Sequence, residues 1–210
     1  MDFAAARRAM VDCQLRPSAV TDSLVVAAMA TVPREEFVPD QVRAIAYIDR
    51  IVPLKDGRGL SPPASVGRML TELEVKPGER ALVVGAGTGY SAAVLAKMGV
   101  EVVALENDPA LLPRLRQVSG ITIVEGPAEL GAPQAAPFDL ILVDGQIEEL
   151  PDALVEQLKV GGRLSACLVE GGVPRLTAGT RSVHGFGLKS FADSSMAPLP
   201  GFARRPVFTF

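Results

Sequence analysis

Short apolar runs alternate with helical patterns through the middle of the chain. Five runs are rich in Val, Leu and Ile without a polar face, as expected for strands buried on both sides. They cover residues 80–84, 101–105, 121–124, 138–143 and 163–169. Helices are predicted between them at residues 90–98, 109–117 and 151–158. The last helix should end before Gly161 and Gly162, which suit a helix C-cap. The alternation predicts a parallel sheet covered by helices.

Both ends of the chain depart from this alternation. Helical periodicity covers residues 4–29 in two pieces separated by Pro17, and Asp22 is placed to cap the second piece. Prolines and glycines interrupt residues 32–63, which predicts an ordered loop layer with short strands. In the tail, residues 183–191 and 205–210 are the best strand candidates. One more helix follows the loop layer, with four apolar residues on one face: Val66, Met69, Leu70 and Leu73.

Composition and charge narrow the classes of function. With 48% hydrophobic and 21% charged residues among 210, the chain has the composition of an ordinary globular protein. The net charge of −3 argues against nucleic-acid binding, which normally needs a basic face. No apolar stretch reaches the roughly 18–20 residues of a membrane span, and we expect no signal peptide. Cys13 and Cys167 are too few for a disulfide framework or a four-thiolate zinc site, so we expect a metal-free cytoplasmic protein.

A glycine-rich loop follows the first strand of the series. Residues 85–90 read Gly-Ala-Gly-Thr-Gly-Tyr. Glycines here let the backbone turn sharply and come close to a ligand, and the next helix presents free N–H groups at its start. The second strand ends at Glu106, 21 residues after Gly85. A carboxylate at this distance is placed to accept hydrogen bonds from both hydroxyls of a ribose.

The spacing of the glycines bears on the class of ligand. Dinucleotide-binding folds commonly carry G-x-G-x-x-G, which positions a pyrophosphate at the helix start. The tighter G-x-G-x-G of this chain is similar to motif I of methyltransferases that use S-adenosyl-L-methionine (SAM), a ligand without phosphate. The alternative is that these glycines only pack a strand against a helix.

Further stretches resemble one family of those enzymes, the protein-L-isoaspartate O-methyltransferases. The most specific is residues 33–39, Pro-Arg-Glu-Glu-Phe-Val-Pro, because most SAM methyltransferases have nothing like it. The other matching stretches lie at residues 10–11, 14–15, 46–49, 85–90, 136–139 and 157–164. The resemblance therefore covers most of the chain.

The resemblance implies a fold and an activity. The fold is a Rossmann-like α/β SAM methyltransferase fold, with a mostly parallel central sheet and helices on both faces. It would be one domain, with an N-terminal helical and loop extension at 1–63, a cofactor-binding core at 64–169 and C-terminal strands at 170–210. The activity is methyl transfer from SAM, leaving S-adenosyl-L-homocysteine, to the α-carboxylate of isoaspartyl residues in damaged proteins or peptides. Neither nucleic acid nor membrane is an expected partner.

The same resemblance assigns site residues. Ser61 is the catalytic candidate, as a hydroxyl that positions the acceptor carboxylate. Asp144 follows the fourth strand, at the sheet edge where ligands of such folds bind. The residues expected to bind the cofactor are Leu60, Gly85, Ala86, Gly87, Thr88, Tyr90, Glu106, Asn107, Pro127, Ala128 and Asp144.

Several positions depart from the family pattern. Where the family reads Gly-Gln-Thr-Ile-Ser-Gln-Pro, residues 57–63 read Gly-Arg-Gly-Leu-Ser-Pro-Pro. Val83 and Pro127 replace acidic residues, and Asp144 begins a stretch that the family writes Thr-Ala-Ala. A carboxylate beside an anionic acceptor would repel it, so Asp144 either faces the sulfonium or signals a different acceptor. The alternatives are a SAM methyltransferase with another acceptor and a SAM-binding homologue without catalysis.

Methylation of a carboxylate does not need a general base. A carboxylate with a pKa of about 4 is ionised at neutral pH, so positioning and partial desolvation suffice. The single histidine, His184, is expected to be structural or exposed. Arg58 either binds a carboxylate or is an exposed loop arginine.

Overall fold

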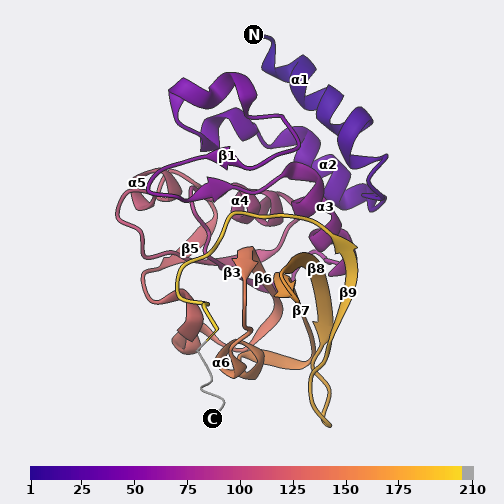
Figure 1. Cartoon of the computed structure of the whole chain (residues 1–210), viewed down its shortest axis with the longest axis vertical. Helices are drawn as coiled ribbons and strands as arrows, with labels where there is room; N and C mark the ends of the chain where they lie inside the picture. Colours follow the sequence, from indigo (N-terminus) through magenta and orange to yellow (C-terminus); the bar gives the residue numbers. More distant parts are fainter. Residues whose placement is uncertain (205–210) are drawn as a thin grey trace.

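A computed structural model describes residues 1–204 of the chain. Within these residues, seven strands form one sheet in the order β5-β4-β3-β6-β7-β8-β9, and β1 pairs separately with β2 (Figure 1). The strands that run parallel are β3 (Arg80–Val84), β4 (Glu101–Leu105), β5 (Ile121–Val124), β6 (Phe138–Ile147) and β7 (Leu158–Glu170). The antiparallel strands at one edge are β8 (Val173–Thr180) and β9 (Leu188–Asp193).

The register of the sheet brings three strand ends level. β3 lies between β4 and β6, and Val84 is paired with Leu105 on one side and with Val143 on the other. The chain moves outward from β3 to β5 and then returns to β6, which makes the carboxyl end of β3 the switch point where such sheets bind ligands. The residues that follow the three paired positions are Gly85, Glu106 and Asp144.

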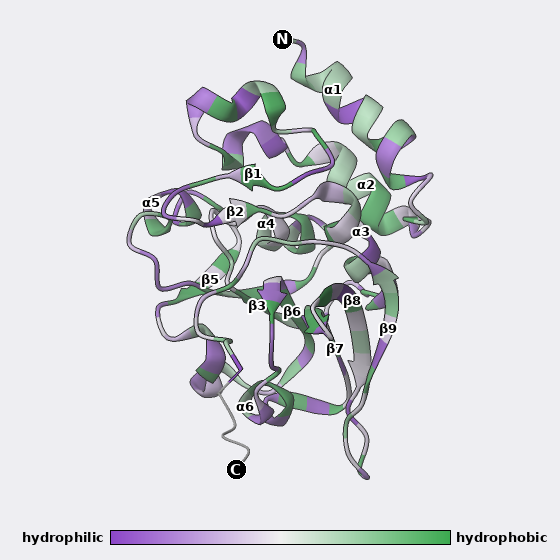
Figure 2. Cartoon of the chain, viewed as in Figure 1, coloured by the Kyte–Doolittle hydropathy of each residue, from purple (hydrophilic) through white to green (hydrophobic). Residues whose placement is uncertain are grey.

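Alternating side chains of β3 reach hydrophobic clusters on opposite faces of the sheet. Ala81 and Val83 join a cluster that includes residues of α3, α4 and α5, whereas Leu82 and Val84 join one that includes α6. Figure 2 shows green apolar residues along the strands and on the helices packed against them. The helices are α3 (Pro63–Glu72), α4 (Tyr90–Lys97), α5 (Leu112–Leu115) and α6 (Asp152–Glu156). Helices cover both faces, so the predicted α/β fold is confirmed. None of the helices in residues 1–204 has the length and apolar character needed to cross a membrane.

The N-terminal residues form the expected layer of helices and loops beyond the end of β3 (Figure 1). Asp22 caps the second helix by accepting hydrogen bonds from the N–H groups of Leu24 and Val25, as predicted. Arg7 ties the first helix to the loops through an ion pair with Glu35 at 3.0 Å. The elements are α1 (Phe3–Met10), a π-helical turn at Val11–Leu15, α2 (Ser23–Thr31), 3₁₀ helices at Arg34–Phe37 and Asp40–Ile45, and the hairpin of β1 (Val52–Pro53) and β2 (Gly59–Leu60).

Several helix and strand boundaries differ from the prediction. The helix expected at 109–117 is only the single turn of α5, because Pro113 has no N–H and suits only the first turn of a helix. The helix expected at 151–158 ends at Glu156. Gly161 and Gly162 do not cap it, because they lie inside β7. β6 extends beyond residue 143 and pairs with β7 through a bulge.

The tail differs as well. The pattern did not predict β8, which follows a turn at Gly171 and Gly172. β9 covers only the end of the strand expected at 183–191, and the strand expected at 205–210 lies outside the described residues. His184 is exposed in the turn before β9, in agreement with one of its two predicted settings.

After β9 the chain crosses back over the sheet as a segment that we call the strap, residues 196–202. Gln146 of β6 donates its N–H to the carbonyl of Ala197 at 2.8 Å, and its own carbonyl accepts from the N–H of Leu199 at 2.9 Å. Leu199 and Phe202 are buried. Figure 1 shows this segment in yellow, running from β9 across the sheet towards β5.

Candidate active site

The glycine loop, residues 85–90, is buried at the end of β3. Its first two N–H groups both donate to the carbonyl of Leu105 at 3.0 Å, which ties the loop to the end of β4. Gly85 has a φ of +70°, and a Cβ there would lie 2.5 Å from a methyl carbon of Leu199. This position therefore requires glycine for its conformation and for the close approach of the strap. At Gly87 the nearest atoms would be 3.9 Å from a Cβ, which leaves room for a single methyl group in the loop.

Glu106 lies at the centre of the hydrogen bonds at this sheet edge, and its side chain is 1% exposed. Oε2 accepts from the N–H of Gly87 at 2.7 Å, and Oε1 accepts from the N–H groups of Asn107 and Asp108 at 3.0 Å each. Burial alone would raise the pKa of Glu106, but the hydrogen bonds and charge of Arg58, with the N–H groups of Asp108 and Gly87, outweigh it and lower the pKa. The carboxylate stays charged beside the loop.

Arg58 forms a two-pronged ion pair with Glu106. Nη1 donates to Oε1 at 3.0 Å, and Nη2 donates to Oε2 at 2.9 Å. Nη2 also donates to the carbonyl of Gly85 at 3.5 Å. The Arg58 side chain is only 9% exposed. The alternative of an exposed loop arginine is therefore wrong.

A second carboxylate, that of Asp144, lies at the neighbouring strand. Oδ1 accepts from the hydroxyl of Ser61 at 2.7 Å, and Oδ2 accepts from the hydroxyl of Ser91 at 2.5 Å. Burial raises the pKa of Asp144, and the two hydroxyls with the charges of Arg34 and Arg58 oppose this shift only in part. Since Ser61 comes from the N-terminal layer and Asp144 from β6, this pair joins the layer to the sheet.

Arg34 supports Ser61 from within the N-terminal layer. Its side chain is fully buried, with Nε donating to the carbonyl of Ala46 and Nη2 to the carbonyl of Ser61, each at 2.6 Å. The guanidinium carbon lies 4.7 Å from the centre of the Tyr90 ring. Among the described residues, Arg34 Nη1 and the Tyr90 hydroxyl have no hydrogen-bond partner. Arg34 thus holds the backbone at Ser61 and places a positive charge behind it.

The other predicted residues divide into two groups. Leu60 is buried in β2 beside Ser61, and the Thr88 hydroxyl donates to the carbonyl of Phe37 at 2.7 Å, fastening the loop to the N-terminal layer. Pro127 and Ala128 follow β5, which lies two strands from β3. Within residues 1–204, no hydrogen bond joins them to the other predicted residues, so their place in the site rests on position alone.

Four residues of the site did not emerge from the sequence analysis as candidates. Ser91 follows the glycine loop directly, and a hydroxyl in the first turn of that helix was a usable signal. Arg34 lies in the most specific matching stretch, but its role depends on a contact with a residue 27 positions away. Leu54 lies near Gly87 and Leu199 near Gly85. Both leucines approach the loop from distant segments, which no local pattern predicts.

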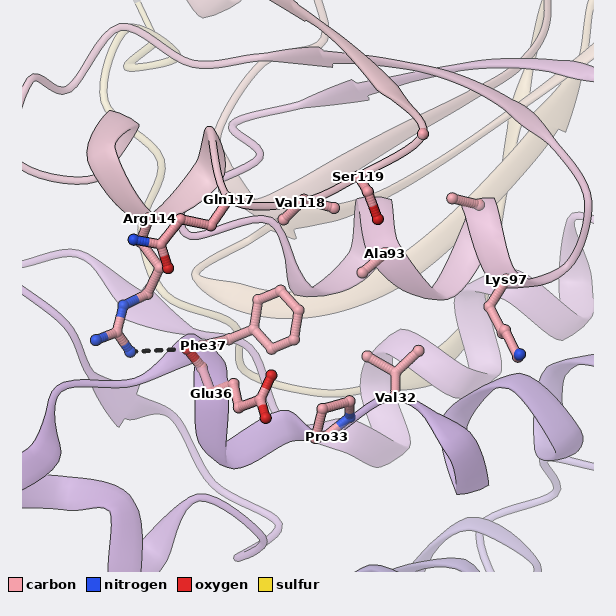
Figure 3. Close-up of a pocket in the computed structure, with 12 residues that line it drawn as sticks. Val32, Pro33, Glu36, Phe37, Ala93, Lys97, Arg114, Gln117, Val118 and Ser119 are labelled. Carbon is pink, nitrogen blue, oxygen red and sulfur yellow. Dashed lines mark hydrogen bonds between the residues drawn. The ribbon is translucent and has the colours of Figure 1, made fainter.

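A separate hollow of about 660 Å³ lies between the N-terminal layer, α4 and the turn before β5 (Figure 3). Phe37, Ala93 and Val118 are among its lining residues. Arg114 crosses its rim and donates to the carbonyl of Glu36 at 2.8 Å. None of the predicted site residues lines this hollow, so it is distinct from the hydrogen-bonded groups at the strand ends.

The groups at the strand ends suit a ligand that carries a ribose and no phosphate. The group beside the loop is the carboxylate of Glu106, which accepts hydrogen bonds from hydroxyls and repels phosphate. The absence of a side chain at Gly87 would allow a ligand to approach the backbone closely. A positively charged sulfonium would be attracted by Glu106 and Asp144 together. The residues present therefore fit SAM.

Comparison with known proteins decides the family. Residues 5–177 match the family described as protein-L-isoaspartate(D-aspartate) O-methyltransferase (PCMT). The chain belongs to the PCMT family. It is 42% identical over 208 residues to protein-L-isoaspartate O-methyltransferase 2 of Marinobacter nauticus, covering 95% of each chain. It is also 42% identical over 204 residues to the protein-L-isoaspartate O-methyltransferase of Methylorubrum extorquens, covering 94% of this chain and 90% of that one.

Two solved structures share the PCMT fold with this chain. A protein-L-isoaspartate O-methyltransferase matches with a TM-score of 0.81 and 22% identity, covering 93% of this chain and 66% of that one. A Plasmodium falciparum PCMT protein in complex with S-adenosyl-L-homocysteine matches with a TM-score of 0.78 and 24% identity, covering 92% and 97%. At these identities the likeness shows the fold.

Two departures from the PCMT pattern bring charge to the strand ends. Arg58 stands where the PCMT resemblance leads one to expect glutamine, and Asp144 stands where it leads one to expect threonine. Arg58 donates two hydrogen bonds to the carboxylate of Glu106, and Asp144 accepts two from serine hydroxyls. The divergent positions are therefore part of the hydrogen-bonded network at the strand ends.

Proposed function

We propose that the chain is a SAM-dependent O-methyltransferase that acts on the α-carboxylate of L-isoaspartyl residues in proteins and peptides. The observation that carries the proposal is that residues suited to bind the cofactor and residues suited to bind the acceptor lie at the same edge of the sheet. Glu106 lies beside the glycine loop, and Ser61 is hydrogen-bonded to Asp144 at the next strand. Family membership supports the same reaction, since the named relatives are protein-L-isoaspartate O-methyltransferases.

Glu106 and the glycine loop would hold the cofactor. Glu106 would accept hydrogen bonds from the ribose hydroxyls, and Gly87 would leave room for them. When bound, SAM supplies a methyl group on a positively charged sulfur and becomes S-adenosyl-L-homocysteine. Leu54 and the strap cover the loop and keep water from the reacting groups. The other residues that we propose to line this half are Leu60, Gly85, Ala86, Thr88, Tyr90, Asn107, Pro127, Ala128 and Asp144.

Ser61 would position the acceptor. The acceptor carboxylate has an ordinary pKa of about 4, so it is ionised at neutral pH and needs no general base. What it needs is a fixed orientation and a partly dry surrounding, which a hydroxyl that is 2% exposed can provide. Arg34 holds the backbone of Ser61, and its buried positive charge favours an anion in front of it.

A second candidate is a SAM methyltransferase with a different acceptor. The observation that favours it is Asp144, whose carboxylate faces the hydroxyl that would orient the acceptor. Two carboxylates at such a distance repel each other. An acceptor that donates a hydrogen bond, such as a hydroxyl or amine, would suit Asp144 better.

Calorimetry with SAM and with S-adenosyl-L-homocysteine tests the cofactor half. We expect binding by the unmodified chain and loss of binding in Gly87→Val, because the side chain fills the room in the loop. Gly78→Val is the matched control, since Gly78 also has a positive φ, +82°, but lies in an exposed turn away from the site. No detectable binding by the unmodified chain would rule out both enzyme functions.

Transfer of a radiolabelled methyl group to an isoaspartyl peptide tests the acceptor half. The control is the same peptide with aspartate, whose side-chain carboxylate and backbone are arranged differently. Transfer to the isoaspartyl peptide alone supports the proposed function. Transfer to neither peptide, despite SAM binding, favours another acceptor or a homologue without catalysis.

We further propose that the chain acts as one domain in the cytoplasm. The larger hydrophobic cluster contains residues from α1 through β8, which supports a single domain. Cys13 is exposed and unpaired. Cys167 is unpaired too, and burial raises the pKa of its thiol to about 11. Two free thiols are typical of a reducing compartment.

A further inference from the structure

The carboxylate of Glu106 has no acceptor capacity left. Oε1 accepts hydrogen bonds from Arg58 and from the N–H groups of Asn107 and Asp108. Oε2 accepts from Arg58 and from the N–H of Gly87. Together these bonds exceed the roughly four lone-pair directions that a carboxylate offers. A ribose that uses this carboxylate must therefore displace one of the present donors.

Arg58 is the donor that can leave. The three N–H groups belong to the backbone. That of Gly87 lies in the loop that is bonded to Leu105. Those of Asn107 and Asp108 follow Glu106, whose own N–H donates to the carbonyl of Val124. The guanidinium instead ends a long side chain on the β1–β2 hairpin, where Asp56 and Gly57 are exposed. A ribose has two hydroxyl donors, which match the two bonds to Glu106 that Arg58 would give up.

We propose that Arg58 determines specificity for the acceptor: the ribose of the cofactor takes its place on Glu106, and the released guanidinium binds the acceptor's carboxylate. This inference rests on the proposed function. It couples the two substrates, because the cofactor frees the group that the acceptor needs. By thermodynamic linkage, each substrate then tightens the binding of the other by the same factor.

The position of Arg58 allows its guanidinium to move from Glu106 to the carboxylate of the acceptor. Nη2 lies 3.5 Å from the carbonyl oxygen of Gly85. Gly85 and Asp144 follow paired residues of adjacent strands, which lie about 4.8 Å apart in a sheet. Asp144 in turn accepts the hydrogen bond of Ser61. The charge of Arg58 also acts on Asp144, where it opposes the rise in the pKa that burial causes.

The charges at the strand ends also favour a cation that can move. Glu106 and Asp144 lie there, and an isoaspartyl acceptor would add a third carboxylate. Arg34 is held by two carbonyls and by the ring of Tyr90, so it cannot follow the acceptor. Arg58 already binds one carboxylate in a two-pronged geometry, and the acceptor offers the same geometry.

Calorimetry with S-adenosyl-L-homocysteine tests the competition without any acceptor. Arg58→Gln introduces the residue expected from the family pattern and should bind about tenfold more tightly than the unmodified chain, because no guanidinium has to be displaced. Arg58→Lys keeps the charge but cannot make the two-pronged pair, and it should also bind more tightly. Lys55→Gln removes an exposed cation of the same hairpin and should bind like the unmodified chain. Equal or weaker binding by both Arg58 variants overturns the proposal.

Kinetics and binding of an isoaspartyl peptide test the second role. In Arg58→Gln the KM for the peptide should rise about tenfold or more, with a smaller change in kcat, while Lys55→Gln keeps both values. The unmodified chain should bind the peptide about tenfold more tightly when S-adenosyl-L-homocysteine is present, and Arg58→Gln should lose this gain. An unchanged KM, or a gain that persists in the variant, overturns the proposal.

The two measurements separate this inference from the proposed function. If the unmodified chain binds no S-adenosyl-L-homocysteine or methylates no isoaspartyl peptide, the proposed function fails and the role of Arg58 fails with it. If the unmodified chain does both and the Arg58 variants behave in the same way, the function stands and the role of Arg58 is refuted.

Discussion

The hydroxyl of Ser61 donates to Oδ1 of Asp144 at 2.7 Å, although the two residues are 83 positions apart in the sequence. A serine hydroxyl carries one proton, so this bond uses the only donor that Ser61 has. While Asp144 is charged, Ser61 can turn only lone pairs towards an acceptor. The protonation of Asp144 therefore bears on how Ser61 can orient a carboxylate.

Removal of the Ser61 hydroxyl should weaken catalysis and spare the cofactor. Ser61 can donate to the acceptor carboxylate only when its hydroxyl turns away from Asp144, which protonation of Asp144 favours. A hydrogen bond to a charged group contributes about 1.5–3 kcal/mol, so Ser61→Ala should lower kcat/KM for an isoaspartyl peptide roughly 10- to 100-fold. Affinity for S-adenosyl-L-homocysteine should stay within about twofold of the unmodified value. The control is Ser65→Ala, which removes another buried hydroxyl whose partner is Ser194 at 2.6 Å. Equal losses in both variants would show that the effect of Ser61 is structural.

Neutralisation of Asp144 should stabilise the protein in a pH-dependent way. Burial raises the pKa of Asp144, so the folded state binds the proton more readily than the unfolded chain. The unmodified protein therefore loses stability as pH rises through the interval between the ordinary pKa of about 3.9 and the raised one. Asp144→Asn does not titrate. Its free energy of unfolding should exceed that of the unmodified chain at neutral pH, with the difference shrinking towards pH 4. Urea unfolding at several pH values measures this, and a difference independent of pH would contradict it.

Contact between the strap and the glycine loop should appear in a double-mutant cycle. Gly85→Ala combines a positive φ with a Cβ only 2.5 Å from Leu199. It should lower the free energy of unfolding by about 2–4 kcal/mol. Gly78→Ala also has a positive φ but meets nothing within 4 Å, so it should cost only about 1–2 kcal/mol. Combining Gly85→Ala with Leu199→Ala should recover about 1–2 kcal/mol of the summed losses. Strict additivity would show that the strap does not press on the loop.

The two tyrosines of the chain should respond differently to loss of the hydroxyl. Tyr90→Phe removes a buried hydroxyl that has no partner among the described residues and keeps the ring that stacks on Arg34. Stability should change by less than about 0.5 kcal/mol. Tyr47→Phe should cost about 1–3 kcal/mol, because that hydroxyl donates to Glu35 and accepts from Arg7. Thermal or urea unfolding compares the two, and similar losses would show that the Tyr90 hydroxyl has a partner.

The centre of the sheet was predictable from local pattern. β3, β4 and β5 begin and end where the apolar runs do, because each run is followed by a glycine or an acidic residue. β3 and β4 are buried on both faces as expected, whereas β5 is an edge strand with Thr122 exposed and its other residues half-buried. The same pattern placed Gly85 and Glu106 at one sheet edge. α5 was predicted too long, since periodicity ignores the missing N–H of Pro113.

Contacts between distant segments were not predictable in this way. Arg58 reaches Glu106 across 48 positions, and the sequence alone left it either buried with a carboxylate or exposed. β8 contains Pro174 and pairs with β7 and β9 as an antiparallel meander, so its register depends on neighbours rather than on its own alternation. The strap has no strand-like pattern, and its place depends on the bonds of Gln146.

The strap also sets the order in which the site can be completed during synthesis. Gly85 and Leu199, which nearly touch, are 114 residues apart, so the loop emerges from the ribosome long before the segment that covers it. Until residues 196–202 are made, the loop lacks its cover on one side. A nascent chain that ends within β9 would thus leave the glycine loop open on the side of Gly85, and the contact with Leu199 would form only after the strap has been made.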